Sequence, residues 1–372
     1  MIQQRREAAR QTVVPPPVGR LAVGPFFAAL ASLVVVLALL WVGFLYLSNT
    51  KTANLLNAVI AIVWGVGGVA ALFTLTNAVI EALPPRPRDA LRPFLFFLPG
   101  VGILFLFLSI PTLITLYQSF FNNDTTQFVG FANYLAVFTD SSMLESFRNN
   151  LIWLFVGTAF TVALGLLIAV LADRSRFESV AKAIIFMPMA ISLVGSSVIW
   201  RFVYSSAPPG QPQIGLANAV LTAFGGQPQS WLTLQPWNNL FLILVMIWGQ
   251  TGFAMVLLSA ALKGVPTDLV EAAQVDGATE FQAFFRVVIP YIQGTILTVT
   301  TTTAIGTLKI FDVVYVMTGG QYGTEVIGTE FYRQFFTNTN YGYGAAIAIV
   351  LFIAISPVLV YNLRQLGQQE GF

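Results

Sequence analysis

The chain reads Lys263-Gly-Val-Pro-Thr-Asp-Leu-Val-Glu-Ala-Ala-Gln-Val-Asp-Gly-Ala-Thr-Glu-Phe-Gln-Ala-Phe-Phe-Arg-Val-Val-Ile-Pro290 between two long apolar runs. This order of residues predicts a helix, a tight turn and a second helix. Pro266 suits the first helical turn, and Asp268 followed by Glu271 resembles a capping box. Gly277 suits the end of the first helix because glycine can adopt a positive φ angle.

The second predicted helix begins with Thr279 and Gln282, which have the spacing of another capping box. Its apolar stripe consists of Phe281, Phe284, Phe285, Val288 and Ile289, and we expect Pro290 to end it at the membrane. On the first helix, Leu269, Ala272 and Ala273 form a face that another surface can approach closely. One interpretation is an amphipathic loop resting on the bilayer. The other is a rigid protrusion that receives force from a soluble partner.

Apolar runs organise the rest of the chain, which is 56% hydrophobic and 9% charged. A helix needs about 20 apolar residues to cross the hydrocarbon layer of a membrane. Runs of this length predict an all-α, polytopic membrane protein with eight transmembrane helices. The expected spans are residues 25–47, 54–81, 93–119, 149–172, 181–204, 239–262, 291–317 and 343–363.

The distribution of Lys and Arg predicts the orientation, because cytoplasmic segments carry the excess of positive charge. With a cytoplasmic N-terminus, the inside residues are Arg5, Arg6, Arg10, Arg20, Arg86, Arg88, Arg92, Arg174, Arg176, Lys182, Lys263, Arg286 and Arg364. The outside residues are then Lys51, Arg148 and Arg333. We therefore expect both termini in the cytoplasm. The first run is too long for a secretory signal and is expected to remain as a span.

Several functional classes lack the residues they need. The sequence contains no Cys and no His, so no common zinc or haem ligand set is present and no metal site is expected. It also lacks a P-loop, which means that any ATP chemistry belongs to another chain and that this chain is not expected to be an enzyme. An ion-coupled secondary transporter remains as an alternative. It would need a mid-membrane carboxylate, and the deepest candidate is Asp312, beside Lys309.

Prolines between residues 83 and 93 predict the one internal boundary. Residues 1–92 are then an N-terminal extension with two transmembrane helices, and residues 93–372 a six-helix core. The expected outside segment 205–238 contains no charged residue. It either folds over the outer mouth or receives a partner, and its Trp231 and Trp237 are expected to anchor at the membrane interface.

The loop resembles the EAA motif of binding-protein-dependent ABC import permeases. The matching string is Glu271-Ala272-Ala273-x3-Gly277-x9-Val287-x-Ile289-Pro290, with Val287 and Ile289 in place of the usual Ile and Leu. Glu271–Ala278 and Phe311–Gly320 are similar to the carbohydrate-uptake, maltose-type branch, and Leu308–Gly320 is most similar to alpha-glucoside and glucosylglycerol permeases. One departure is the short loop after the third span, where the maltose permease carries a large domain.

This resemblance implies a type I ABC importer permease fold, with the family's transmembrane region over about residues 147–363 and the coupling loop over 263–290. It implies a multi-pass protein of the bacterial inner membrane that imports a sugar or glycoside. The implied partners are a second EAA-type permease in a heterodimer, two copies of an ATPase that binds ATP and Mg²⁺, and an extracytoplasmic sugar-binding protein. No nucleic acid is implied. The residues expected to contact the ATPase are Glu271, Ala272, Ala273, Asp276 and Gly277.

Polar residues within the spans suggest where a substrate passes, because such groups are costly in lipid and usually face the bundle interior. A neutral sugar requires hydroxyl, amide and aromatic groups of this kind. The candidate pathway residues are Ser192, Ser196, Trp248, Gly249, Gln250, Thr251, Thr303, Gly306, Thr307, Lys309, Phe311 and Asp312. For the Ser and Thr residues, bonding to their own helix is the alternative. Lys309 and Asp312 alternatively form an ion pair within one helix. An importer of a non-sugar solute also remains possible.

Overall fold

The computed structural model describes residues 23–49, 55–208 and 210–369, and most of the described residues lie in helices. It divides into two compact units, Met1–Pro111 and Thr112–Phe372. This division lies within the third predicted span, whereas the sequence pattern placed a boundary at residues 92 and 93. The assignment of residues 1–92 as a separate extension therefore stays a prediction.

The first unit contains long apolar helices. They are α2 (Val23–Asn49), α3 (Leu55–Glu81) and α4 (Pro85–Leu104), which continues into η1 (Phe105–Ser109). The next helix, α5 (Ile110–Gln118), contains the division and belongs mostly to the second unit. Gly68 of α3 allows α2 to approach, since a Cβ atom there would lie 2.5 Å from Leu40 Cδ2. The predicted linker at residues 83–93 is mostly helical instead. Pro85 begins α4, where a missing N–H costs nothing, and Pro93 lies inside the helix.

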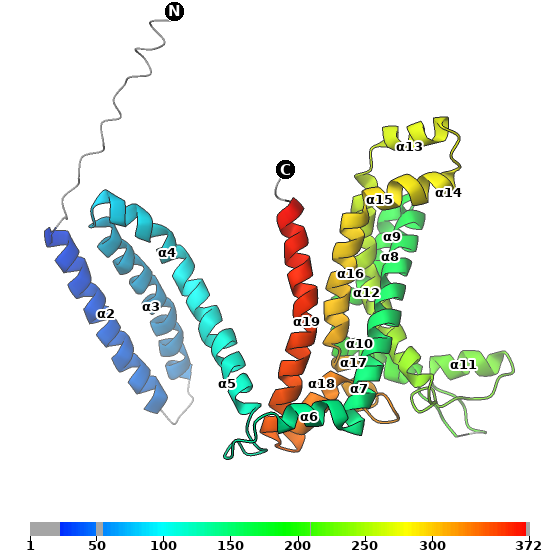
Figure 1. The fold of residues 1–372 in the computed structure, drawn as a ribbon, viewed down its shortest axis with the longest axis horizontal. Helices are drawn as coiled ribbons and strands as arrows, with labels where there is room; N and C mark the ends of the chain where they lie inside the picture. Colours follow the sequence, from blue (N-terminus) through cyan, green and yellow to red (C-terminus); the bar gives the residue numbers. More distant parts are fainter. Residues whose placement is uncertain (1–22, 50–54, 209, 370–372) are drawn as a thin grey trace, which may run out of the picture. The chain divides into compact units, whose positions relative to one another are not determined.

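The second unit carries the predicted loop (Figure 1). Its helices before the loop are α6 (Ala132–Thr139), α7 (Ser141–Ile152), η2 (Trp153–Gly157), α8 (Thr158–Asp173), α9 (Glu178–Phe186), η3 (Met187–Ala190), α10 (Leu193–Val203), α11 (Leu216–Ala223) and α12 (Asn238–Lys263). From the loop onward they are α13 (Thr267–Val275), α14 (Glu280–Ala283), η4 (Phe284–Val288), α15 (Ile289–Tyr291), α16 (Gln293–Leu308), α17 (Asp312–Met317), α18 (Ile327–Tyr332), η5 (Arg333–Thr337) and α19 (Tyr341–Gln369).

The prediction of eight spans is confirmed with two of the spans broken. Six described helical segments are long and apolar enough to cross a membrane, and two bent helix pairs bring the number to eight. The fifth span is the pair 178–190 and 193–203, which bends by 99°. The seventh span bends by 68° at Ile292 and ends at Leu308, not at residue 317 as predicted. The pattern did not reveal this end because residues 309–317 are as apolar as the helix before them.

Helix α12 lies at the centre of the second unit. Leu242 and Ile243 on α12 are almost fully buried, and they belong to one apolar cluster with Trp153 and with Val313 of α17. Close approach of α8 depends on Gly165, where a Cβ atom would lie 2.6 Å from Ala254 Cβ. Helix α12 therefore lies between the broken fifth span and the broken seventh span, and its middle faces α16 of the seventh span.

Four buried asparagines hold the turn between α17 and α18, and we call Asn149, Asn150, Asn238 and Asn239 the asparagine clamp. Asn149 Nδ2 donates to the carbonyls of residues 323 and 325 at 2.9 and 2.7 Å. Asn238 Nδ2 donates to the carbonyl of residue 322 at 2.7 Å, and Asn239 Nδ2 to that of residue 323 at 3.0 Å. The turn, whose Tyr322 has a φ of 60°, is thereby fixed to α7 and α12.

An ionic cluster lies beside the clamp. Arg333 donates to Glu325 at 2.6 Å, to Ser142 Oγ at 2.8 Å and, through Nη2, to Glu330. Both glutamates are buried, and burial raises the pKa of Glu325, although the Thr329 hydroxyl and the Arg333 guanidinium act in the opposite direction. Each buried carboxylate thus has a cationic or hydroxyl partner, as burial requires.

Replacing Asn150 tests the clamp. Asn150 Oδ1 accepts from Ile327 N at 2.8 Å, and its Nδ2 donates to Leu308 O at 3.1 Å. Asn150→Ala leaves both buried backbone groups unpaired, so we expect it to lower the free energy of unfolding by about 2–4 kcal/mol. The measurement is thermal unfolding of the detergent-purified protein followed by circular dichroism.

The matched control is Asn338→Ala, because the Asn338 amide is exposed and bonds only Gln334, at 3.2 Å, among the contacts described. This control is expected to change the stability by no more than about 0.5 kcal/mol. Equal losses in the two variants would show that the Asn150 carboxamide does not hold the turn.

Candidate functional site

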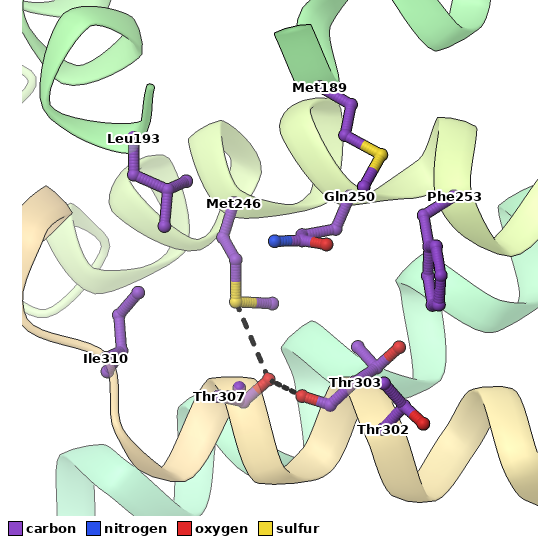
Figure 2. Close-up of a pocket in the computed structure, with 10 residues that line it drawn as sticks. Met189, Leu193, Met246, Gln250, Phe253, Thr302, Thr303, Thr307 and Ile310 are labelled. Carbon is purple, nitrogen blue, oxygen red and sulfur yellow. Dashed lines mark hydrogen bonds between the residues drawn. The ribbon is translucent and has the colours of Figure 1, made fainter. Parts of the chain in front are cut away.

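A cavity of about 300 Å³ lies among α12, α16 and the break in the fifth span. We call it the mid-span cavity, and Figure 2 shows its walls. It is lined by Met189, Leu193, Met246, Gln250, Phe253, Thr302, Thr303, Gly306, Thr307 and Ile310. None of these described residues is charged. Ligand sites typically measure roughly 300–1,000 Å³ and are mostly apolar with a few placed polar groups, and this cavity matches that description.

The polar groups of the cavity come from the two facing helices. The Gln250 carboxamide points from α12 into the space before α16, where Thr302, Thr303 and Thr307 lie (Figure 2). Thr307 Oγ1 donates to Thr303 O at 2.8 Å, as expected for a threonine that bonds its own helix. Within the described chain no group hydrogen-bonds the Gln250 amide. This side chain is therefore the one best able to bind a polar solute.

The broken fifth span forms one wall of the cavity. Pro188 lies in η3, and the chain leaves that short helix with an extended Ile191 before α10 begins. Ser192, a predicted pathway residue, caps α10 by accepting from Gly195 N at 3.1 Å. The break turns Met189 and Leu193 toward the cavity. The Met187-Pro188 pair indicated a kink in the sequence, although not which side chains it would direct inward.

Four other predicted pathway residues lie near the cavity without lining it. Ser196 is buried, and its hydroxyl has no hydrogen-bond partner among the described residues. Thr251 Oγ1 donates to Ile247 O at 2.6 Å and so serves its own helix. The Trp248 ring packs edge-on against Trp200 at 5.7 Å, and Gly249 is buried.

The three predicted residues beyond Leu308 lie outside the cavity as well. Lys309 caps the end of α16, whereas Asp312 begins α17, so the two are not on one continuous helix. The alternative of an intrahelical ion pair is wrong, since no ion pair joins them in the described structure. Phe311 stacks on Tyr315 at 4.9 Å and contacts Tyr332 at 5.4 Å.

Apolar residues of the cavity were not predicted from the sequence. Met246 and Phe253 lie four residues before and three residues after Gln250, which places them on the same helix face. Sequence reasoning selected polar residues because they are unusual within a membrane. It did not recognise Met246 or Phe253, since an apolar residue in a span is ordinary. The helical spacing from Gln250 was the available signal.

The loop of residues 263–290 forms two short helices at one end of the second unit (Figure 1). Gly277 has a φ of +87°, and Ala278 N donates to Ala273 O at 2.9 Å, which closes the end of α13. The predicted second cap is present, with Thr279 N to Gln282 Oε1 at 3.0 Å and Gln282 N to Thr279 Oγ1 at 3.3 Å. Both turns are thus held by local hydrogen bonds.

Two details of the predicted loop are wrong. Pro266 is the N-cap of α13 and no side chain caps it, so Asp268 and Glu271 do not form a capping box. The predicted capping box placed the N-cap at Asp268, two residues after the observed N-cap, Pro266. Pro290 does not end the second helix either, because the π-helical turn η4 accommodates it and α15 continues to Tyr291.

The two sides of α13 differ. Leu269, Ala272, Ala273 and Asp276 share one side at helical spacing, and Leu269 is 43% exposed. Glu271 instead lines a hollow of about 490 Å³ beneath α13, together with Val270 and Gln274. Of the five predicted coupling residues, Ala272, Ala273 and Asp276 are therefore presented on the free side, Gly277 forms the turn, and Glu271 lies toward the hollow.

An ionic cluster beneath α13 joins three helix ends. Lys182 of α9 donates to Glu178 at 2.6 Å and contacts Asp173 of α8, and Ser259 Oγ of α12 donates to Asp173 at 2.8 Å. Lys263, the last residue of α12, also contacts Glu178. These residues were not predicted as a group, because they are far apart in sequence and each resembles an ordinary charged span end.

The connectivity links the loop to the cavity. Helix α12, which carries Gln250, runs directly into α13, and α15 runs through the bend at Ile292 into α16, which carries Thr303. The same two helices therefore hold the cavity's polar groups and support the protruding loop. A displacement of α13 would be transmitted to both cavity walls.

Comparison with known proteins gives consistent results. A family model described as "Binding-protein-dependent transport system inner membrane component" matches residues 161–366. The osmoprotective compounds uptake permease protein of Synechocystis sp. is 51% identical over 272 residues, which cover 73% of this chain and 98% of that protein. The alpha-glucoside transport system permease protein of Rhizobium meliloti is 41% identical over 332 residues, which cover 86% of this chain and 99% of that protein.

A similar fold occurs in a solved structure. It is the crystal structure of a bacterial ABC transporter involved in the import of the acidic polysaccharide alginate. A chain of that transporter is 22% identical with a TM-score of 0.65, and the match covers 75% of this chain and 99% of that one. At this identity the likeness establishes the fold, and it confirms the predicted ABC importer permease architecture.

Substitutions in the loop test its predicted role in coupling. We expect Gly277→Pro and Gly277→Val to abolish ATP-driven uptake while leaving the chain in the membrane, because proline fixes φ near −65° and a β-branched residue disfavours positive φ. A bulky residue at Ala273 should act in the same way by blocking close approach. The measurements are uptake by the reconstituted assembly and the amount of chain in the membrane.

The control is Gly264→Val. Gly264 ends α12 with a φ of −80°, which any residue adopts. This variant should transport at nearly the normal rate. Undiminished uptake by the variants of Gly277 and Ala273 would exclude a coupling role for the loop.

Proposed function

The chain belongs to the family of binding-protein-dependent transport system inner membrane components, and from this we propose that it imports a neutral sugar or glycoside. It is the permease subunit of an ABC importer, a multi-pass membrane protein that is not itself an enzyme. The observation that carries the proposal of a neutral sugar is the uncharged mid-span cavity, with the unpaired amide of Gln250 facing the threonines of α16.

The lining of the cavity suits a polyhydroxylated solute. A primary amide can donate and accept, and so can each hydroxyl, which matches the groups that a sugar presents. Phe253 adds an aromatic surface on which a pyranose ring can pack. A charged solute would require an opposite charge in this low-dielectric setting, and none of the described lining residues supplies one.

The names of the relatives favour the same chemistry. The permease of Rhizobium meliloti is named for alpha-glucoside transport, and a relative from Thermococcus litoralis, 30% identical over 284 residues, is named for trehalose and maltose transport. The relative from Synechocystis is named for osmoprotective compounds. An osmoprotectant that is itself a neutral glycoside satisfies both names, whereas a quaternary ammonium osmoprotectant does not fit the cavity as well.

We also propose the assembly in which the chain works. It pairs with a second permease that carries an EAA motif, and each permease places its coupling helix in one of two ATPase subunits, which bind ATP and Mg²⁺. A binding protein delivers the solute on the opposite side of a bacterial inner membrane, and both termini of the chain are cytoplasmic. The contact residues on this chain are Ala272, Ala273, Asp276 and Gly277 of the loop, with Glu271 at its edge.

Coupling follows from the connectivity of the helices. Closure of the two ATPases would move α13, and α13 is joined to α12 on one side and through α14 and α15 to α16 on the other. The ionic cluster around Lys182 ties α8 and α9 to the end of α12, so these helices move as one body. Such a rigid-body movement would open the cavity alternately to the two sides of the membrane.

Uptake of a labelled sugar tests the function directly. The reconstituted assembly should accumulate a labelled alpha-glucoside when both ATP and the binding protein are present, and not when either is omitted. Excess unlabelled glucoside should compete, whereas a quaternary ammonium osmoprotectant should not. Accumulation driven by an ion gradient without ATP would instead indicate a secondary transporter. ATP-driven uptake of the quaternary ammonium compound would contradict the sugar assignment.

Gln250→Leu tests the cavity. Loss of hydrogen bonds from the amide is expected to raise the KM for uptake roughly tenfold, the effect of about 1.4 kcal/mol. Thr251→Val is the matched control on the neighbouring position, because its hydroxyl bonds Ile247 O and does not line the cavity. The rise in the KM for uptake should be clearly smaller in Thr251→Val than in Gln250→Leu. Equal KM values in wild type and Gln250→Leu would place the solute elsewhere.

A further inference from the structure

The segment 205–238 carries an apolar stripe that no described residue covers. Leu216, Val220 and Phe224 follow one another at a spacing of four on α11 and its C-cap, and they are 62%, 49% and 89% exposed. Ile214, just before the helix, is 81% exposed. Burial of apolar side chains of this size is favourable, so leaving four of them in water would be costly.

Hydrogen bonds on the opposite side of α11 keep this stripe facing outward. Asn218 is fully buried and donates to Gln229 O at 2.9 Å, while its Oδ1 accepts from Trp231 Nε1 at 3.0 Å. Gly215 packs against the backbone of Ser205, where a Cβ atom would lie 2.1 Å from the carbonyl oxygen. The helix therefore cannot roll to bury its stripe.

Trp231 is one of the residues that hold α11 in this orientation. Its ring packs against Phe241 at 5.1 Å and Tyr204 at 6.4 Å, so it joins the segment to the ends of α10 and α12, and its place at the membrane interface stays a prediction. The sequence showed two tryptophans near a span, but not that the Trp231 indole N–H bonds an asparagine within the segment. Trp237, by contrast, is 57% exposed at the start of α12.

The apolar stripe lies next to surface that faces lipid. The segment joins the end of α10 to the start of α12, and α11 runs across the direction of the spans at the end of the bundle remote from α13 (Figure 1). Exposed apolar side chains continue from it onto the spans, namely Phe202 at 70% and Leu240 at 39%. Trp237 lies where a span meets water, the position that tryptophan favours in membrane proteins.

The composition of the segment also fits a lipid surface better than a protein partner. Residues 205–238 contain no Asp, Glu, Lys or Arg. A protein-docking surface usually has a polar rim with charges that set specificity and the rate of association. A helix with an exposed apolar face can bury that face in the boundary between headgroups and acyl chains, which is always present beside the span ends.

We propose that α11 lies in the membrane–water interface on the side opposite α13, with Leu216, Val220 and Phe224 in contact with lipid acyl chains. The segment then anchors the outer ends of α10 and α12 to the bilayer. Because α12 also carries Gln250, the anchor sets the depth at which one wall of the mid-span cavity begins. This inference rests on the spans and not on the identity of the solute.

The absence of cysteine from the sequence makes a site-specific test simple. The full-length chain carrying Phe224→Cys or Val220→Cys is spin-labelled and reconstituted with its partner subunits into vesicles of phosphatidylcholine and phosphatidylglycerol. Power saturation then compares collisions with oxygen, which partitions into lipid, and with a water-soluble nickel chelate. We expect oxygen to dominate several-fold at both positions, as it should at Phe202→Cys on the lipid-facing surface of α10.

The matched control is Gln227→Cys, an exposed polar position three residues beyond Phe224. Its label should collide mainly with the nickel chelate. The proposal is overturned if the labels at 220 and 224 behave like the label at 227, because the stripe then faces water. It is also overturned if they are shielded from both reagents, because a protein partner then covers the stripe. Agreement between the labels at 220 and 224 guards against a local effect of either substitution.

Discussion

A membrane offers no hydrogen-bond partners to the backbone, and this constraint decides where the chain can interrupt a helix. Two spans of the second unit are broken, and in each case protein groups satisfy the exposed backbone. At the first break Ser192 accepts from Gly195 N. At the second, the bend at Ile292, Ile292 N donates to Val288 O at 3.1 Å and Ile292 O accepts from Ile296 N at 3.0 Å. Where the same span ends, Asn150 donates to Leu308 O and accepts from Ile327 N. The cavity exists because these two interruptions are stabilised from within the protein.

The breaks also explain how a cavity of few polar groups can be connected to a distant protrusion. A continuous fifth span would not turn Met189 and Leu193 toward α12 and α16, and the space between those helices would have no such wall. The bend at Ile292 lets the seventh span leave the loop helices and enter the bundle. The helices between the loop and the cavity are unbroken and change direction only at their ends, which suits them to rigid-body movement.

A cluster of polar side chains stabilises each end of the bundle. At the end near α13, the cluster of Lys182, Asp173 and Glu178 joins three helices through charge. At the other end, the asparagine clamp holds the turn after α17 through neutral amides. Helix α11 beside that end carries no charge at all. Ion pairs thus occur at both ends of the bundle, around Lys182 near α13 and around Arg333 beside the clamp, whereas α11 is uncharged.

The sequence by itself determined the class of the protein, because span length, the excess of Lys and Arg on one side, and the turn signals at Gly277, Thr279 and Gln282 are all local properties. It also identified Gln250, Thr303 and Thr307, since polar residues in a span are conspicuous. Only the tertiary structure decided that Ser192 and Thr251 serve backbone groups, that Phe311 packs on tyrosines, and that α16 ends before Lys309. The Ser192 and Thr251 bonds reach only three or four residues along the chain, and the sequence had left such local bonding open as an alternative. The end of α16 and the contact of Phe311 with Tyr332 depend instead on segments far apart in the chain. Asn150, which meets Leu308 and Ile327, shows why hydrophobic periodicity does not record such contacts.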